Sequence, residues 1–409
     1  CWLTSGPWSS GTPEAGSAPA EPRFTPLRGI HEALGAAFTD FGGWQMPVRY
    51  ASDLAEHHAV RQAAGLFDIS HMAEFLVTGP GSGEFLDYAL AGRLSTMAVG
   101  KAKYSLLLDD DGGIIDDVIV YCLGPDWYLV IANAGNREAV AEALAERAPR
   151  APIATAFHAA DTEREHTFAY LPGGDVARIE DVSDAFALIA VQGPFAREIV
   201  AATAGVDASG LDELGYYAAL NSRFDGEPLL IARTGYTGED GYELLVSNAR
   251  ASELWEALTA AGEPLGLVPA GLAARDTLRL EAGMPLYGHE LSRTIVPAQA
   301  GLGRVVALDK PSFVGRDALA TGTEPGAPVL VGLVSDGRRA GRAGYTVLHG
   351  DEVVGEVTSG ALSPTLGYPI AMAFVSPSAA AEGTVLSIDV RGTRVPATVT
   401  ALPFYRRKK

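Results

Sequence analysis

Two adjacent carboxylates stand in a strand-like segment of the sequence. Asp116 and Asp117 belong to IIDDVIVY (114–121), which follows the turn-like DDDGG at 109–113. Side chains alternate faces along a strand, so the two acids lie on opposite faces, each otherwise apolar. A buried carboxylate is costly unless it is hydrogen-bonded or used in chemistry. The acids therefore mark a functional site or are wetted by solvent at a hairpin mouth, and the pattern does not choose between Asp116 and Asp117.

A glycine-rich segment, RTGYTGEDGYELLV (233–246), combines carboxylates with tyrosines. Its glycines permit tight turns and close approach of a ligand to the backbone. Glu239, Asp240 and Glu243 offer carboxylates, and a carboxylate can accept hydrogen bonds from two adjacent N–H groups of a heterocycle. Tyr236 and Tyr242 offer flat faces. The alternative is an ordinary hairpin loop. No G-x-G-x-x-G opens a helix here, so the spacing does not predict a dinucleotide site.

A third segment, AGLAARDTLRLEAG (270–283), has helical character. Arg275 and Arg279 share one helix face, and Asp276 can pair with Arg279 at i,i+3. The alternative is an ion pair on a solvated face. We expect no metal, because the histidines lack a ligand spacing such as H-E-x-x-H. The sequence has no G-x-S-x-G elbow and no P-loop, so local motifs do not support acyl or phosphoryl transfer.

The composition restricts the partners and the compartment. The chain has 409 residues, 47% of them hydrophobic, and a formal net charge of −19. Such a charge repels nucleic acids and anionic membranes, so we expect neither as a partner. No apolar run reaches the length of about 18 residues that suggests a membrane helix. The two cysteines, Cys1 and Cys122, cannot form a disulfide framework, which favours a reducing, cytoplasmic location.

The elements that must position these residues predict an α+β fold. Residues 1–28 are rich in Ser, Gly, Pro and Ala, and we expect a disordered leader. Residues 29–322 mix helix and strand patterns, while 323–409 show short strands separated by Gly and Pro, typical of a small β-barrel. Within the mixed region we expect helices at 53–64, 137–147, 251–261 and 269–280, and strands at 74–77, 104–108, 114–121, 229–232 and 242–246.

Taken in order, these segments resemble the glycine cleavage T-protein (aminomethyltransferase) family over about residues 29–405. The related iron–sulfur-assembly branch carries a K-G-C-Y-x-G-Q-E type motif, which does not occur in this sequence. FGGW stands where the family more often has FAGW. The matching segments are FGGWQMPVRY (41–50), GLFDISHM (65–72), KYSLLLDDDGGIIDDVIVY (103–121), VQGP (191–194), RTGYTGEDGYEL (233–244), AGLAARDTLRLEAGMPLYGHEL (270–291), VGRDAL (314–319), VTSGALSPTLG (357–367) and LPFY (402–405).

The resemblance implies a cloverleaf of two interlocked α/β domains and a C-terminal β-barrel, with tetrahydrofolate in the central hole. It assigns catalysis to the second Asp of the GGxxDD motif, here Asp117, and the grip on the amino edge of the pterin to Glu243. Arg275 corresponds to the first Arg of AARDxLR. The remaining folate-lining positions implied by the resemblance are Tyr104, Tyr236, Tyr121 and Asn133.

The resemblance also implies a reaction and a partner. An aminomethyl group on the dihydrolipoyl arm of H-protein would give its methylene to tetrahydrofolate, with release of ammonia. A second hypothesis is a folate-dependent demethylase of a small methylated amine or sulfur compound, which would share the pterin grip. A third is a non-catalytic folate-binding protein, against which the retained Asp117 counts.

Overall fold

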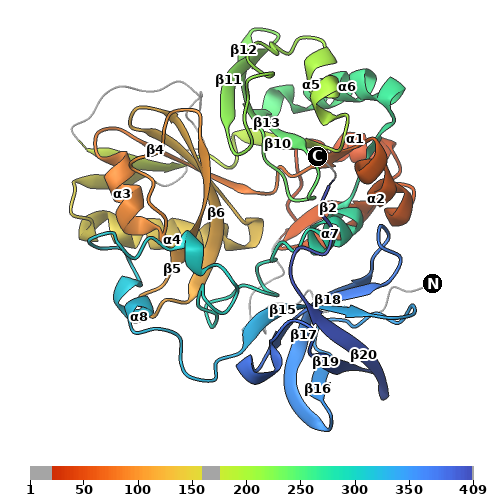
Figure 1. Cartoon of the computed structure of the whole chain (residues 1–409). Coiled ribbons are helices and arrows are strands. Elements are labelled where there is room, and N and C mark those ends of the chain that lie inside the picture. The colour runs from red at the N-terminus through yellow and green to blue at the C-terminus, as the bar shows by residue number, and fades with distance from the viewer. Residues whose placement is uncertain (1–20, 159–175, 408–409) are drawn as a thin grey trace.

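The computed structural model describes residues 21–158 and 176–407, and the structural statements below concern these residues. The chain forms three parts that lie around a common centre (Figure 1). Residues of all three parts line one cavity. Two are built on six-stranded sheets and the third is a closed barrel. The predicted α+β class, with two mixed domains followed by a barrel, is confirmed.

The first sheet carries the two adjacent aspartates. Its strands pair antiparallel except β8 and β9, which are parallel. Helices α3 (Ser82–Ala89) and α4 (Arg137–Arg147) pack on one face. In order across the sheet the strands are β5 (Ala102–Leu108), β6 (Ile114–Gly124), β7 (Trp127–Ala132), β4 (Ala73–Thr78), β9 (Ala177–Asp181) and β8 (Thr155–His158).

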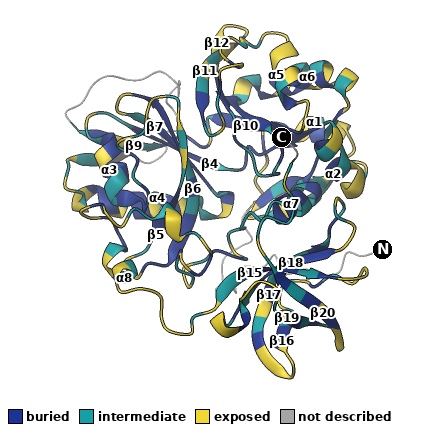
Figure 2. Ribbon diagram, in the orientation of Figure 1, coloured by how far each residue is buried: buried dark blue, intermediate teal, exposed yellow. Residues whose placement is uncertain are grey.

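The second sheet carries the glycine-rich segment. Its strands are antiparallel except β14, which pairs parallel with β3. Helices α5 (Ala196–Ala202) and α6 (Ala251–Gly262) cover its outer face, and their exposed sides are yellow in Figure 2. In order the strands are β11 (Ala219–Phe224), β12 (Glu227–Ala232), β13 (Gly241–Ser247), β10 (Phe186–Gln192), β3 (Ala64–Asp68) and β14 (Leu267–Pro269).

The chain passes twice between the sheets, which interlocks the two domains. Strands β3 and β4 are consecutive in the chain but belong to different sheets, and so are β9 and β10. The inner faces meet in one apolar cluster, to which β6 and β7 contribute Tyr121 and Ile131 and the second sheet contributes Phe67 and Leu188. This burial stabilises the relative position of the two sheets.

The C-terminal barrel and the remaining helices close the structure. The barrel order is β15 (Val329–Ser335), β18 (Pro369–Val375), β17 (Glu352–Leu362), β16 (Thr346–His349), β19 (Val385–Val390) and β20 (Thr393–Thr400). Outside the sheets lie α1 (Arg28–Ala33), the hairpin β1 (Ala37–Phe41) and β2 (Trp44–Arg49), α2 (Asp53–Gln62), α7 (Leu272–Glu281) and α8 (Arg316–Ala320). Short 3-10 turns are η1 (Ala134–Asn136), η2 (Ala148–Arg150), η3 (Asn248–Arg250), η4 (Glu263–Leu265), η5 (Gly303–Val305) and η6 (Pro377–Ala379).

Several element boundaries differ from the sequence-based expectation. Helix α2 ends at Gln62 rather than at residue 64, because β3 begins at Ala64. Ser52 caps α2 by accepting a hydrogen bond from the Ala55 N–H. Helix α7 begins at Leu272 rather than 269, because residues 267–269 pair with β3.

The predicted disorder of residues 21–28 is wrong, because these residues belong to the fold. Residues 1–20, the rest of the predicted leader, lie outside the described residues. Leu27 is fully buried in the core of the second sheet, and the Thr25 hydroxyl donates to Asp68 Oδ2 at 2.6 Å. The Arg23 N–H donates to the Gly43 carbonyl at 3.0 Å. Apolar burial at Leu27 outweighs the low order expected from the composition.

Candidate active site

A cavity of about 800 Å³ lies where the three domains meet. The first sheet lines it from β5, β6 and the end of β7, and the second from the loop between β12 and β13 and from β13. Helix α7 and the chain that follows it form another wall, and the barrel adds Arg342 and residues 361, 362 and 364. The volume is typical of small-molecule sites. Six of the seven predicted site residues line it: Asp117, Glu243, Arg275, Tyr236, Tyr104 and Asn133.

Asp117 projects from β6 into this cavity, with two donors on its carboxylate. The Tyr104 hydroxyl donates to Oδ2 at 3.0 Å, and the Asn133 side-chain amide donates to Oδ1 at 2.8 Å. Burial raises the pKa of Asp117, while the hydrogen bonds from Tyr104 and Asn133 act in the opposite direction. The structure thus directs Asp117, not Asp116, towards a ligand.

Asp116 lies on the opposite face of β6 and is fully buried. Its carboxylate accepts hydrogen bonds from the backbone N–H and side-chain amide of Asn133, at 2.9 and 2.8 Å, and from the Asn136 amide at 2.6 Å. Burial and the charge of Asp117 raise the pKa of Asp116 to about 8, although these hydrogen bonds oppose the shift. The hypothesis that both acids are wetted at a hairpin mouth is therefore wrong for Asp116.

Glu243 enters the cavity from β13, opposite the first sheet. Its side chain is nearly buried, and Oε2 accepts a hydrogen bond from the Thr234 hydroxyl at 2.5 Å. Tyr121, predicted as a folate-lining residue, lies behind Glu243 and outside the cavity wall. Its hydroxyl contacts Thr234 Oγ1 at 3.0 Å and donates to Glu243 Oε2 at 3.4 Å. The Thr234 and Tyr121 hydroxyls both donate to Oε2, so Oε1 remains available to a ligand in the cavity.

Arg275 brings a cation to the same cavity from α7. Its Nη1 is buried and has no hydrogen-bond partner among the described residues. The guanidinium carbon lies 4.9 Å from the centroid of the Tyr236 ring, and the Tyr236 hydroxyl donates to the Pro285 carbonyl at 2.5 Å. Burial lowers the pKa of Arg275, against the effect of the Glu243 charge. This buried donor is therefore available to an acceptor in the cavity.

Of the glycines in the 233–246 segment, Gly238 has a φ of +83°, as a tight turn requires, while Gly235 and Gly241 make room for a side chain of the protein itself. A Cβ at Gly235 would lie 2.0 Å from Gln192 Oε1, and one at Gly241 would lie 2.2 Å from Gln192 Nε2. Gln192 donates to the Thr234 carbonyl at 3.1 Å and accepts from the Thr237 hydroxyl at 3.0 Å. The close approach is therefore made by a side chain of β10, which holds the loop carrying Tyr236.

Arg279, one turn beyond Arg275, is buried rather than solvated. Its predicted pairing with Asp276 is present at 2.8 Å. It also contacts Glu290 at 3.0 Å and donates to the Ser359 hydroxyl of the barrel at 2.8 Å. The hypothesis of an ion pair on a solvated face is wrong, because α7 is covered by the barrel.

The sequence interpretation missed His71, which follows β3 and lines the cavity. Its Nδ1 is buried without a hydrogen-bond partner in the described structure, and burial lowers the pKa of His71 to about 4. The GLFDISHM segment was a matching segment, but it carried no chemical role for this residue. A neutral imidazole can donate or accept one hydrogen bond at each nitrogen, so His71 is a further group available to a ligand.

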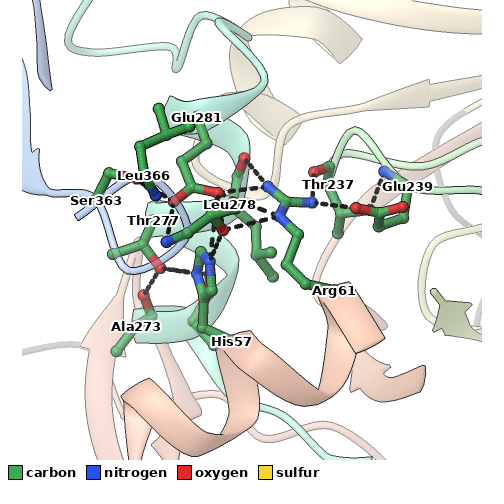
Figure 3. A network of polar contacts seen from close by, with 12 residues as sticks. His57, Arg61, Thr237, Glu239, Ala273, Thr277, Leu278, Glu281, Ser363 and Leu366 are labelled. Carbon is green, nitrogen blue, oxygen red and sulfur yellow. Dashed lines mark hydrogen bonds and ion pairs between the residues drawn. The ribbon is translucent and has the colours of Figure 1, made fainter. Parts of the chain in front are cut away.

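Neighbouring the cavity, a polar network joins α2, α7 and the barrel (Figure 3). The Arg61 guanidinium contacts Glu281 at 2.8 Å and Glu239 at 3.0 Å, and all three side chains are buried. The His57 imidazole lies between Thr277 and Thr365, at 2.7 and 2.8 Å. The network fixes the end of the helix that carries Arg275.

Residues 21–158 and 176–407 contain no group of three or more His, Cys, Asp or Glu side chains placed to hold a metal ion. In the same part of the chain, no helix has the length and apolar character needed to cross a membrane.

Comparison with protein-family models yields two matches along the chain. Residues 27–310 match the GCVT N-terminal domain, and residues 329–406 match the glycine cleavage T-protein C-terminal barrel domain. The chain belongs to the glycine cleavage T-protein family. The interval between the two matches contains α8 and the segment that leads from it to the barrel.

Curated members of the T-protein family are similar to the chain over nearly its whole length. The aminomethyltransferase of Streptomyces avermitilis is 54% identical over 394 residues, covering 95% of this chain and 99% of that protein. The aminomethyltransferase of Cutibacterium acnes is 53% identical over 391 residues, covering 94% and 99%. The crystal structure of glycine cleavage system aminomethyltransferase T from Bartonella henselae superposes with a TM-score of 0.81 at 34% identity, covering 95% and 99%.

Proposed function

We propose that this T-protein family member transfers the methylene of an aminomethyl-dihydrolipoyl H-protein to tetrahydrofolate and releases ammonia. The observation that carries the proposal is that Asp117, Glu243 and Arg275 line one cavity in a chain that matches both domains of the family. Full-length similarity to curated aminomethyltransferases favours this activity over the demethylase hypothesis.

The cavity fits a reduced folate on three counts. Glu243 Oε1 is free to accept from the amino edge of a pterin, since the protein's own donors occupy Oε2. Arg275 Nη1 is a buried donor that needs an acceptor, which a pterin carbonyl or ring nitrogen supplies. The faces of Tyr104 and Tyr236 line the cavity and can pack against a flat heterocycle. Asn133 lines it beside Asp117.

Tetrahydrofolate, when bound, supplies the amine nitrogens that accept the one-carbon unit. The role of the protein is to place an anion beside the carbon during transfer. An ionised Asp117 stabilises positive charge at that carbon and can hold or release a proton at Oδ2, next to the Tyr104 hydroxyl. Tyr121 and Thr234 act behind the cavity wall by holding the Glu243 carboxylate in place.

The partner and the location complete the proposal. A lipoylated H-protein is the carrier that presents the aminomethyl group, and the reaction uses no metal. A cytoplasmic location is favoured by the cysteine content, since Cys122 is a buried free thiol. Nucleic acids and membranes are not proposed as partners.

The test compares donors under one set of conditions. Purified protein and tetrahydrofolate are mixed with aminomethylated H-protein, and separately with dimethylglycine, sarcosine and a methylated sulfur compound. Ammonia and methylenetetrahydrofolate should appear only with the first donor. A methylated folate product from a small donor, with the carrier inert, would establish the demethylase function instead.

A further inference from the structure

Asn133 contacts both adjacent aspartates at once. It follows β7 directly and lies beside β6. Its side-chain nitrogen donates to Asp116 Oδ1 and Asp117 Oδ1, each at 2.8 Å, and lies 3.3 Å from the Asp117 carbonyl oxygen. The two carboxylates stand on opposite faces of the strand, so a single amide spans the strand edge to reach both.

Asp116 can act on the cavity only through other residues. It is fully buried and forms no part of the cavity wall. Its Oδ1 accepts from the side-chain amides of Asn133 and Asn136, and its Oδ2 accepts from the Asn133 backbone N–H. Reversing the Asn133 amide would place its carbonyl oxygen against Oδ1 of both aspartates, which carry only acceptors when ionised. Asp116 Oδ1 therefore adds to the two acceptors of Asp117, its Oδ1 and its carbonyl oxygen, in holding the amide nitrogen of Asn133 towards Asp117.

We propose that Asn133 is a positioning residue for Asp117, and that Asp116, held by Asn136, fixes Asn133 in the required orientation. The inference rests on the proposed catalytic role of Asp117 and adds two residues that act behind it. Asn133 holds Oδ1 of Asp117, so that Oδ2, whose one hydrogen bond within residues 21–158 and 176–407 comes from the Tyr104 hydroxyl, is the oxygen available for the transferred carbon or a proton.

The same contact affects the charge of Asp117. Burial raises the pKa of Asp117, and the donors that oppose this effect are the Tyr104 hydroxyl and the Asn133 amide. Loss of one donor to the ionised form therefore makes the acid harder to ionise. The titratable groups that face Asp117 from the packed elements are Asp116 of β6, Tyr104 of β5, and Tyr217, Tyr236 and Tyr287 of the surrounding loops.

The first test is Asn133→Leu, which keeps the approximate shape and removes both polar ends. With aminomethylated H-protein and tetrahydrofolate, kcat should fall roughly 10- to 100-fold, the scale for a misplaced reacting group. The acid limb of the kcat profile should move to higher pH by about one unit, the scale of a lost hydrogen bond to a charged group. The dissociation constant for tetrahydrofolate should change by less than the fall in kcat. A larger dissociation constant for tetrahydrofolate, with unchanged kcat and pH profile, would mean that Asn133 only binds the folate.

Two variants outside the cavity separate this role from direct contact. Asp116→Asn changes the carboxylate that anchors the Asn133 side chain. Asn136→Ala removes one hydrogen-bond donor to that carboxylate. Both should lower kcat, Asn136→Ala less, with tetrahydrofolate binding retained. Asp117→Asn is assayed in parallel. If Asp117→Asn loses turnover while all three other variants keep wild-type kcat and pH profile, the positioning role is wrong and the proposed function stands. If Asp117→Asn keeps turnover, the proposed function of Asp117 is itself wrong.

Discussion

Glu281, the last residue of α7, accepts hydrogen bonds from both the backbone N–H and the hydroxyl of Thr365, at 2.9 and 2.7 Å. Thr365 lies between barrel strands β17 and β18, so this carboxylate joins the barrel to the helix that carries Arg275. Arg61 and His57 of α2 approach Glu281 Oε2 at 2.8 and 3.3 Å (Figure 3). This buried anion thus helps to set the position of the barrel wall of the cavity, together with the Arg279–Ser359 hydrogen bond.

Replacing Glu281 by Gln should therefore destabilise the protein at neutral pH. Burial by itself raises the pKa of Glu281, but hydrogen bonds from His57, Ser363 and Thr365 outweigh it and lower the pKa to about 2. Against the ordinary value of 4.5, that difference corresponds to a contribution of about 3 kcal/mol. Urea unfolding of wild type and Glu281→Gln at pH 7 measures it.

The pH dependence of the free energy of unfolding tests whether the charge of Glu281 is responsible. A carboxylate with a lowered pKa contributes stability that is present above pH 4.5 and is lost as the pH falls towards 2. The gap between wild type and Glu281→Gln should be constant from pH 7 to about 5 and narrow below that. The exposed Glu256 of α6 provides the matched control, Glu256→Gln. A gap that stays constant down to pH 3 would mean that shape, not charge, explains the loss.

The sequence predicted local elements well where the apolar pattern was regular. Helix α4 matches its predicted range, and the hairpin of β5 and β6 follows the turn at 109–113 as expected. Alternation along β6 correctly placed Asp116 and Asp117 on opposite faces. Only the family resemblance favoured Asp117, because the faces differ in what covers them. That covering comes from α4 on one face and from the second sheet on the other, and the periodicity within the strand shows neither.

The features that the sequence did not predict depend on contacts between residues that are far apart in the chain. Nothing local at Gly235 shows that Gln192 lies against it, and nothing local at Glu281 shows that Thr365 will meet it. The surroundings of Tyr121 also depend on a distant segment. Tyr121 lies on the face of β6 that the second sheet covers, so its hydroxyl contacts Glu243 from behind the cavity wall. Residues from all three domains line the cavity, so no single segment of the sequence defines its walls.

Glu74→Gln should stabilise the protein at neutral and alkaline pH. Both carboxylate oxygens of Glu74 are buried without hydrogen-bond partners in the described structure. Burial, and next the charge of Asp181, raise its pKa well above the usual 4.5. The stability associated with its proton is full below pH 4.5 and is lost as the pH rises towards the folded-state pKa. Gln is neutral at every pH.

The measurement is the unfolding midpoint of both proteins between pH 5 and 9. The two proteins should be similar near pH 5, and the variant should be the more stable one at pH 8, with a gap that increases with pH. Glu256→Gln again serves as the control. Equal midpoints at pH 8 would show that Glu74 meets no charge penalty in its site.

Glu243→Ala should weaken tetrahydrofolate binding. The proposed bonds from the pterin to Oε1 are hydrogen bonds to a charged group, whose loss costs about 1.5–3 kcal/mol. Isothermal calorimetry measures the change. Tyr121→Phe is the matched comparison, since it removes one distant donor to Oε2 at 3.4 Å and leaves Oε1 in place, so its effect should be much smaller. An unchanged dissociation constant for Glu243→Ala would mean that the pterin binds elsewhere.

Asp117→Asn should retain the fold and tetrahydrofolate binding but lose most turnover. The shape of the side chain is nearly preserved, while the charge that stabilises a cationic carbon is removed. Loss of a group used in proton transfer and charge stabilisation reduces kcat by roughly 100-fold or more. Steady-state ammonia release with aminomethylated H-protein measures the effect, and calorimetry confirms folate binding.

The neighbouring acid provides the sharpest comparison. Asp116→Asn makes the same carboxyl-to-amide change one residue away, at a buried position outside the cavity wall. Its kcat should therefore fall less than that of Asp117→Asn. The pH profile adds a second criterion: burial raises the pKa of Asp117, so wild-type turnover should decline towards acid pH as this carboxyl takes up a proton. Turnover by Asp117→Asn at the wild-type rate, or a larger loss in Asp116→Asn, would reassign the reacting carboxylate.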